Sequence, residues 1–392
     1  GESGTPGYSF VFHTESADLD SQQGLRWWVT YSPSSPMMIA PTIQDPWDIE
    51  FEDPDSSDPL GHRGYFVGGT GHPDGGIFST TDSGRSWTPE MGGPGNPVNT
   101  MYAVAALDGG KAVACGYGGQ IWVRSPGGTW TLESDPQFTA PLTGANGYGG
   151  NTCWVVGTWG FLRRSRNVGP GATWETQSPT YGAHATCGAI DEPLWRLQDV
   201  HFQDEDEGLV VGQNYLIAKT QTGCSNGTGC RWQLKYGFVT PNGVLNALAF
   251  SNVNQDRGVA VGNGAPPVLY TQDFGDTWIA ASMPAGSQNA ALVAADDAGG
   301  GILFAAGRNA GVSALYKVNT GIGSAAMKVN LSGPILDPDF VLKGISFLSQ
   351  TEGFAVGVRN DGLSEEVCAY RLTVSGLSGV ATDASPFYAI PG

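Results

Sequence analysis

The chain has 392 residues, of which 59 are glycine and only 14% are charged. Glycine weakens helices and the helix formers Lys and Glu are scarce, so this composition excludes a largely helical protein and predicts an all-β fold of short strands and tight turns. The net charge of −18 argues against nucleic-acid binding because it repels phosphate, and the chain lacks the apolar run of about 18 residues that would span a membrane.

The first 45 residues precede the repeating part of the chain. Residues 1–7 have no charged-then-apolar leader pattern, so the numbering starts either after processing or in a protein without a leader. Residues 25–31 include Arg-Trp-Trp-Val-Thr-Tyr, which has the aromatic and β-branched character of a strand. Residues 33–60 are rich in proline and aspartate and predict a long excursion before the first blade of the repeating part.

A short apolar run that ends in glycine recurs seven times within residues 46–375. Residues 197–202, 245–250 and 342–347, each ahead of such a run, alternate between apolar and polar side chains, as strands packed on one face do. The repeated glycines are spaced by about the length of one four-stranded antiparallel blade, so we expect a seven-bladed β-propeller. The glycines are 41 to 55 residues apart and are Gly68, Gly116, Gly157, Gly212, Gly262, Gly307 and Gly357.

A polar turn that ends in tryptophan follows the third strand of the early repeats. Residues 80–87 and 271–278 both read Thr-x-Asp-x-Gly-x-(Ser/Thr)-Trp. In such a turn the aspartate accepts backbone N–H groups, the glycine takes a positive φ, and the tryptophan packs between sheets. We assign these structural roles to Asp82, Gly84, Trp87, Asp273, Gly275 and Trp278, with Trp130, Trp174 and Trp232 at the matching place in the repeats between.

The two turns resemble the Asp-box of sialidases, xyloglucanases, sortilin-type receptors and the photosystem II stability and assembly factor family. The order of strand, Asp/Gly turn and apolar-Val-Gly run in residues 197–212 and 342–357 is most similar to the photosystem II assembly factor type. That resemblance implies a propeller that does not catalyse and that recognises other proteins.

The two ends of the chain are predicted to complete one domain, residues 1–392. The seventh repeat supplies three strands, the last near residues 367–372, and has no tryptophan-bearing fourth strand. We expect the segment 25–31 to fill that place and close the ring, because an open sheet edge is a liability in a radial repeat. Residues 376–392 then form a C-terminal tail.

The loops that follow the seven glycines are predicted to share one face, opposite the tryptophan turns. Aromatic, Asn and Arg side chains in a common concavity are typical of a recognition surface. We therefore expect a protein partner or complex to bind there; the alternative is that each loop only stabilises its own turn. The candidate residues are His72, Asp74, Tyr117, Trp159, Asn214, Tyr215, Asn263, Arg308 and Arg359.

Carbohydrate binding or glycoside hydrolysis on the same face is the alternative function. A sialidase clamps a carboxylate with three arginines and has an early Arg-Ile-Pro motif. On this face a third arginine is not evident, and the chain lacks the motif. Other glycosidases need two carboxylates about 5 to 10 Å apart. Asp74 and Asp361 are the candidates for such a pair. We expect no enzyme activity, cofactor or metal, because the five histidines have no ligand spacing and the acidic segment 53–58 lacks the glycine and glutamate of a calcium loop.

The cysteines bear on localisation. Cys224 and Cys230 bracket a five-residue loop suited to a small disulfide ring, with two unpaired thiols as the alternative. Asn226 and Asn330 begin glycosylation sequons. These features favour a secreted, periplasmic or cell-surface protein, while the pairing of the other four cysteines stays open.

Overall fold

The computed structural model describes the greater part of the chain from residue 46 onward. Within the described residues the regular structure is β, apart from two short 3-10 turns, η1 (Tyr117–Gly119) and η2 (Thr158–Gly160), as the composition predicts. All of it belongs to one compact unit, Pro41–Gly392. The described residues are 46–52, 62–69, 75–84, 87–92, 98–133, 139–176, 180–181, 196–221, 231–237, 243–320, 325–329, 331–332, 339–360, 365–374 and 382–390.

The first three sheets each contain four antiparallel strands, ordered in space as they are in the chain. The first sheet consists of β1 (Pro46–Phe51), β2 (Gly64–Gly68), β3 (Gly76–Thr80) and β4 (Thr88–Gly92). The second sheet consists of β5 (Met101–Leu107), β6 (Lys111–Gly116), β7 (Ile121–Arg124) and β8 (Trp130–Leu132). The third consists of β9 (Leu142–Tyr148), β10 (Thr152–Gly157), β11 (Leu162–Ser165) and β12 (Glu175–Thr176).

The later sheets repeat this order with additions at their edges. The next four-stranded group is β14 (Leu197–Phe202), β15 (Gly208–Gly212), β16 (Ile217–Thr220) and β17 (Arg231–Tyr236), with β13 (Thr180–Tyr181) parallel to β17. Two groups then join through the pair Asn263–Ala291 into one eight-stranded sheet. They are β18 (Val244–Phe250), β19 (Gly258–Asn263), β20 (Val268–Thr271) and β21 (Ile279–Ala280), then β22 (Ala291–Asp297), β23 (Ile302–Asn309), β24 (Val312–Asn319) and β25 (Ala326–Val329).

The last sheet departs from the sequence-based expectation. It contains β27 (Phe340–Ser349), β28 (Glu352–Asn360), β29 (Glu365–Val374) and β30 (Thr382–Ile390), with β26 (Leu331–Ser332) parallel to β30. The prediction of a tail over residues 376–392 is wrong for β30, which pairs antiparallel with β29 along its length. The edge of β29 that seemed open is therefore taken by the chain's own next segment. The expected closing strand, residues 25–31, lies outside the described residues.

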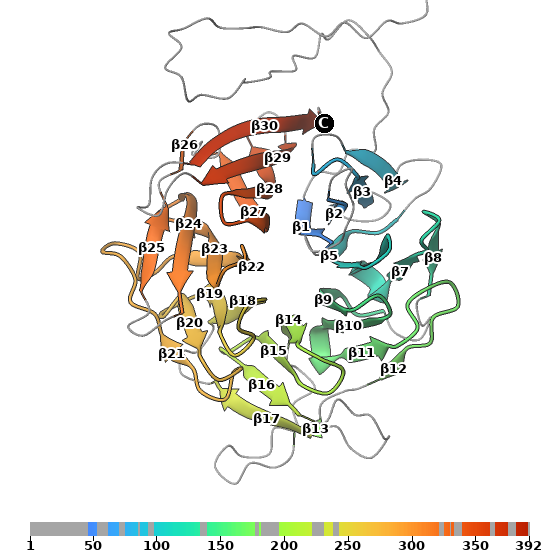
Figure 1. Ribbon diagram of the computed structural model, residues 1–392, viewed down its shortest axis with the longest axis horizontal. Coiled ribbons are helices and arrows are strands. Elements are labelled where there is room, and N and C mark those ends of the chain that lie inside the picture. The colour runs from blue at the N-terminus through green and yellow to red at the C-terminus, as the bar shows by residue number, and fades with distance from the viewer. Residues whose placement is uncertain are drawn as a thin grey trace, which may run out of the picture. The chain divides into compact units, whose positions relative to one another are not determined.

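Figure 1 shows the first strand of each four-stranded group nearest the centre of the unit. Each of these inner strands contacts the next one along the chain, and β1 also contacts β27. The expected excursion over 33–60 therefore contains a strand, since β1 lies within it. The seven inner strands are β1, β5, β9, β14, β18, β22 and β27.

The repeated glycines stand where second strands press against the start of an inner strand. A Cβ atom on Gly116 would lie 2.1 Å from the carbonyl oxygen of Thr100, and one on Gly262 would lie 1.9 Å from that of Val244. Such distances are far below contact, so only glycine fits there. The register that made the repeats visible in the sequence is thus a backbone packing constraint.

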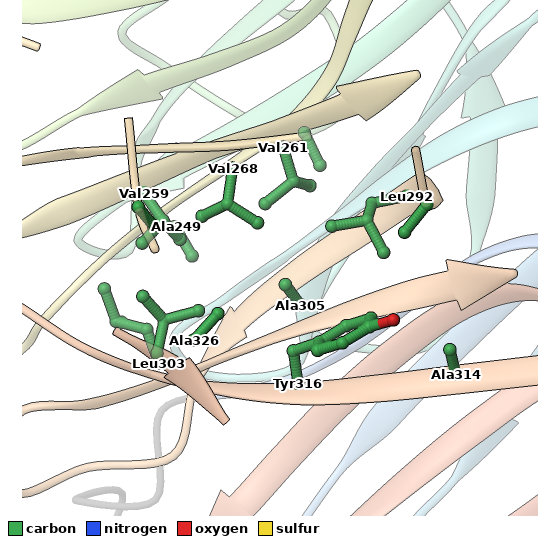
Figure 2. Packing of buried hydrophobic residues seen from close by; sticks show 14 residues of the cluster. Ala249, Val259, Val261, Val268, Leu292, Leu303, Ala305, Ala314, Tyr316 and Ala326 are labelled. Carbon is green, nitrogen blue, oxygen red and sulfur yellow. The ribbon is translucent and has the colours of Figure 1, made fainter. Parts of the chain in front are cut away.

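The core lies between neighbouring four-stranded groups, including the two that share the eight-stranded sheet. Figure 2 shows one such layer, in which side chains of β18 to β20 face those of β22 to β25. The tryptophans that end the polar turns also pack across these layers, as predicted: Trp130 meets Tyr65 of the preceding sheet edge to face, with ring centroids 6.2 Å apart. The labelled residues in Figure 2 are Ala249, Val259, Val261, Val268, Leu292, Leu303, Ala305, Ala314, Tyr316 and Ala326.

The two matching turns share a hydrogen bond from threonine to aspartate and a glycine with left-handed φ. Thr271 donates its hydroxyl to Asp273 at 2.8 Å, and Asp273 accepts the backbone N–H of Thr277 at 2.8 Å. Gly275 has φ 77°. The turn at Thr80 repeats the first bond, to Asp82 at 2.8 Å, with Gly84 at φ 72°. Trp87 and Trp278 are both buried, each 8% exposed.

Candidate functional site

Two of the predicted face residues are strongly exposed aromatic side chains. Tyr117, in η1 after β6, is 49% exposed, and Trp159, in η2 after β10, is 62% exposed. Trp159 also has left-handed backbone angles, φ 62° and ψ 30°. The same turn position carries Gly118 in the preceding repeat and Asn214 in the following one, both with positive φ. Trp159 therefore bears a conformational cost that glycine avoids and asparagine reduces, while gaining little from burial.

Tyr215 is not part of that surface, contrary to the prediction. Its side chain is fully buried, and its hydroxyl donates to the carbonyl oxygen of Pro266 at 2.8 Å. Gly243 and Gly264 leave the room for its ring, since a Cβ on Gly243 would lie 2.1 Å from it. Burial raises the pKa of Tyr215 to about 12. This residue joins two sheets and does not face a ligand.

Some of the remaining predicted residues lie near the ends of strands, and the others lie outside the described residues. Asn263 ends β19, and its Oδ1 accepts the backbone N–H of Val244 at 2.9 Å. Arg308 lies in β23 and donates to the carbonyl oxygen of Gly311, across a two-residue hairpin turn. Arg359 lies in β28, not in a loop. His72, Asp74, Asp361, Cys224 and Cys230 lie outside the described residues.

The structure reveals a ring of residues that the sequence reasoning missed. In every inner strand, the residue after the one paired with the repeated glycine stands in a bulge or irregularity of the pairing. None of these seven side chains is buried, and all line one cavity. Aligning the inner strands on the glycine register would have found them. We call them the rim residues: Trp47, Tyr102, Thr143, Gln198, Asn246, Val293 and Lys343.

Aromatic side chains dominate one side of the rim. Trp47 is 36% exposed, and Tyr102 meets it edge to face, with ring centroids 5.3 Å apart. The Lys343 ammonium lies over the Trp47 ring, 4.1 Å from its centroid. The Trp47 indole donates to the carbonyl oxygen of Gly69 at 3.3 Å, which fixes the ring's orientation. The rim thus offers an oriented aromatic surface with a cation already resting on it.

The rim residues enclose a cavity of about 120 Å³ at the meeting point of the inner strands. Small residues of the same strands, among them Ala103, Gly144 and Ala247, form much of its wall. Asp48 and Asp199 also line it. Both carboxylates are enclosed by protein yet keep partial solvent exposure, because they face this cavity.

The acidic side chains of the inner strands bridge neighbouring sheets. Asp48 Oδ2 accepts the backbone N–H of Val104 in β5 at 2.9 Å. Asp199 Oδ2 accepts that of Leu248 in β18 at 2.7 Å, and Asn146 plays the same part from β9 to β14. A second level holds Glu50, bonded to Ala106 of β5, and Asp296, bonded to Phe347 of β27.

Burial decides the protonation of these groups. Desolvation raises the pKa of Asp48 to about 6 and those of Asp199 and Asp296 to about 7, against the opposing effect of their backbone hydrogen bonds. Glu50 has a pKa well above its ordinary value, first through burial and then through the nearby Asp48. His201, stacked on Phe250 with ring centroids 4.6 Å apart, has its pKa lowered by burial to about 4.

Other chemistry has little support in the part of the chain that the structure describes. No group of three or more His, Cys, Asp or Glu residues there is arranged to hold a metal ion. Cys115 and Cys153 are buried free thiols whose pKa values burial raises above the ordinary value. No helix among the described residues has the length and hydropathy needed to cross a membrane.

The fold is similar to those of solved β-propellers. YCF48 from Cyanidioschyzon merolae matches with a TM-score of 0.55 and 15% identity, over 81% of this chain and 94% of that one. YCF48 bound to a D1 peptide matches with a TM-score of 0.53 and 15% identity, over 80% and 90%. The WD40 repeats of RRP9 match with a TM-score of 0.54 and 10% identity, over 80% and 87%. At these identities the likeness establishes the fold, a β-propeller. The chain matches no known sequence family and no curated protein.

Proposed function

We propose that the chain is a seven-bladed propeller of the Asp-box type whose ring closes between β1 and β27. The contacts of β1 with both β5 and β27 support this arrangement. A Cβ on Gly344 would lie 3.4 Å from Asp48 Cα and from the Ile49 side chain, so β27 and β1 lie within van der Waals reach of each other. Each blade then contributes one rim residue to the central cavity.

We propose that this propeller is an exported protein without enzymatic activity and that it recognises a protein partner or complex. The proposal is carried by one observation, the exposed aromatic side chains at a single end of the inner strands. An inner strand begins where the second strand ends, so Trp47 and Tyr102 share a face with the loops that hold Tyr117 and Trp159. Exposed aromatic residues of this kind are the usual anchors of a protein interface.

The structural neighbours support a protein partner over other ligands. YCF48 is a photosystem II assembly factor and has been solved with a D1 peptide bound. Propellers of the WD40 class, to which RRP9 belongs, are protein-binding scaffolds. The sequence resemblance to the photosystem II assembly factor family points the same way, because those propellers recognise proteins.

Affinity capture from the native source tests this function. Trp47→Ala and Trp159→Ala should each lower the yield of the same co-purifying proteins. Met327→Ala is the matched control: Met327 is 44% exposed in β25, away from the rim, and should leave the yield unchanged. If both tryptophan variants capture the same proteins as the unmodified chain, the proposed face is wrong.

A glycan array separates the carbohydrate alternative. Tryptophan rings beside amide side chains such as Gln198 and Asn246 also suit sugars, so binding to a glycan that Trp47→Ala abolishes would favour that function. Export has its own test, because a secreted protein keeps disulfides that the cytosol would reduce. Peptide maps with and without reductant should show Cys224 linked to Cys230.

A further inference from the structure

The charge of the central cavity is unbalanced. Asp48 and Asp199 line it, and neither has an ion pair among the described residues; the charged group that acts on Asp199 is the Asp48 carboxylate. The Lys343 ammonium lies over the Trp47 ring on the rim. The cavity therefore combines an aromatic rim with an acidic wall, in a chain whose net charge is −18.

We propose that the cavity receives a lysine or arginine side chain from a basic segment of the protein partner. Trp47 and Tyr102 would pack on the aliphatic stem and the cation, and Asp48 and Asp199 would face the charged end. This inference rests on the proposed function and adds the chemistry of the partner. It commits to a basic protein segment, so that acidic segments and sugars become outcomes of the test.

The dimensions suit one side chain. The cavity of about 120 Å³ has room for several waters, which is enough for the end of one extended basic side chain. Long basic side chains lay their methylene groups on apolar surface and keep the charge at a polar end, as this cavity requires. Lys343 over Trp47 is an internal example of an ammonium on this rim.

The chain's overall charge complements such a partner. A net charge of −18 attracts a basic segment at long range and raises its rate of encounter. Long-range attraction does not select a site, however. The selection comes from the cavity, where the desolvated carboxylates gain most from an incoming cation.

The variant Lys343→Met distinguishes a basic partner from an acidic one. For a basic side chain Lys343 is a like charge on the rim, so Lys343→Met should strengthen binding. For an acidic side chain it is the rim's own cation, so the same change should abolish binding. Lys343→Met keeps an unbranched apolar stem against Trp47, so packing is largely retained.

The experiment uses three synthetic decapeptides that differ only at two positions in a Gly/Ser background, with Lys, acetyl-lysine or Glu at both. Their binding to the whole chain is measured by calorimetry at low salt and pH 8. We expect one site for the Lys peptide, with affinity raised about threefold or more by Lys343→Met and lowered about fivefold or more by Asp199→Asn, as expected for charges in partly buried contact. Acetyl-lysine and Glu peptides should bind far more weakly.

Two controls separate the cavity from general electrostatic attraction. Asp256→Asn removes the same charge from an exposed loop and should leave the affinity unchanged. Asp296→Asn changes a carboxylate that also bridges two sheets but does not line the cavity, and should have a smaller effect than Asp199→Asn. Equal losses in Asp256→Asn and Asp199→Asn would overturn the inference.

The remaining outcomes also decide the question. Tighter binding of the Glu peptide, lost in Lys343→Met, would show an acidic partner, and glycan binding that depends on Trp47 would show a sugar. Native proteins captured through Trp159 but unaffected by Lys343→Met and Asp199→Asn would leave the proposed function standing while rejecting the basic side chain. If neither the rim variants nor Trp159→Ala changes which native proteins are captured, both the proposed function and the basic side chain are rejected.

Discussion

The Asp199 carboxylate in β14 accepts the backbone N–H of Leu248 in β18 at 2.7 Å, joining two neighbouring sheets through one side chain. Asp48 does the same from β1 to β5. These bonds replace the water that each carboxylate loses on burial, yet desolvation still outweighs them, since the pKa values of both groups are raised. Burying each group therefore costs less free energy when it is protonated than when it is charged.

Stability should therefore fall as the pH rises through neutrality. Asp48, with a pKa of about 6, and Asp199 and Asp296, at about 7, bind protons in the folded chain that the unfolded chain releases near pH 4. Their contribution is complete below about pH 4 and is lost as the pH approaches 7. His201, with its pKa lowered to about 4, acts in the opposite direction below about pH 6.5. Denaturant unfolding between pH 5 and 8 measures the net slope.

Asp199→Asn isolates one carboxylate in this comparison. The variant keeps His201 and every other group, so the difference in slope from the unmodified chain belongs to Asp199. We expect the unmodified chain to lose about 2 kcal/mol more than the variant between pH 5 and 8, as an order of magnitude. Asp256→Asn, in an exposed loop, should change nothing. Parallel pH profiles for all three proteins would contradict the assignment.

The features of this fold that the sequence predicts are those at which local packing allows only one kind of residue. Gly116 and Gly262 are visible as repeats because backbone atoms of an inner strand exclude any side chain there. The sequence did not predict Trp47 as a site residue, because β1 lies in a Pro- and Asp-rich segment with the composition of a loop. Ile49 and Phe51 nevertheless alternate as a strand should. Asp48 in this strand faces a cavity, which is a feature of the packed sheets and not of the local sequence.

The candidate face illustrates the same limit. Trp159 and Tyr215 occupy the turns of consecutive repeats, and both have positive φ. One is 62% exposed and the other fully buried, because Gly243 and Gly264 make room for the Tyr215 ring in a neighbouring sheet. The two residues stand one position apart in matching turns. The room for the Tyr215 ring depends on glycines up to about fifty residues away along the chain, which only the packed structure brings close to it.

The ion pair between Glu90 and Arg124 should be costly to break. Arg124 Nε and Nη2 each donate to the Glu90 carboxylate at 2.7 Å, Ser79 donates to it at 2.8 Å, and the Trp130 indole also bonds it. The pair links β4 to β7, and both side chains are mostly buried. Glu90→Gln should lower the free energy of unfolding by about 3 kcal/mol, because it leaves a buried guanidinium unpaired.

A double variant distinguishes the charge from the packing. Glu90→Gln with Arg124→Met removes both charges, so its loss of stability should be smaller than the sum of the two single losses. Chemical denaturation at pH 7 measures all three proteins. Additive losses would mean that Glu90 and Arg124 act independently, contrary to the bidentate geometry.

Trp159→Gly should be more stable than Trp159→Ala, and both variants should weaken recognition. Glycine adopts φ 62° without the steric cost that Trp159 bears, and a side chain that is 62% exposed loses little burial on removal. Relative to Trp159→Ala, which keeps the Cβ atom, we expect a gain of up to about 1 kcal/mol, partly offset by the entropy of the unfolded chain. Thermal unfolding checks the stability and affinity capture the binding. A glycine variant less stable than the alanine variant would show that the left-handed turn is not strained.

Removing β30 tests the sheet at the C-terminal end of the described chain. Deleting residues 376–392 takes away the strand that pairs with β29 from Val367 to Val374 and leaves an unpaired edge. An exposed edge of that length favours pairing between molecules, so the shortened chain should unfold at lower temperature and aggregate as concentration rises. Deleting only residues 391 and 392 keeps β30 and should leave both properties unchanged. Thermal scans and light scattering at two concentrations measure the effect. Equal behaviour of the two deletions would mean that residues 376–392 form a tail and that another segment covers β29.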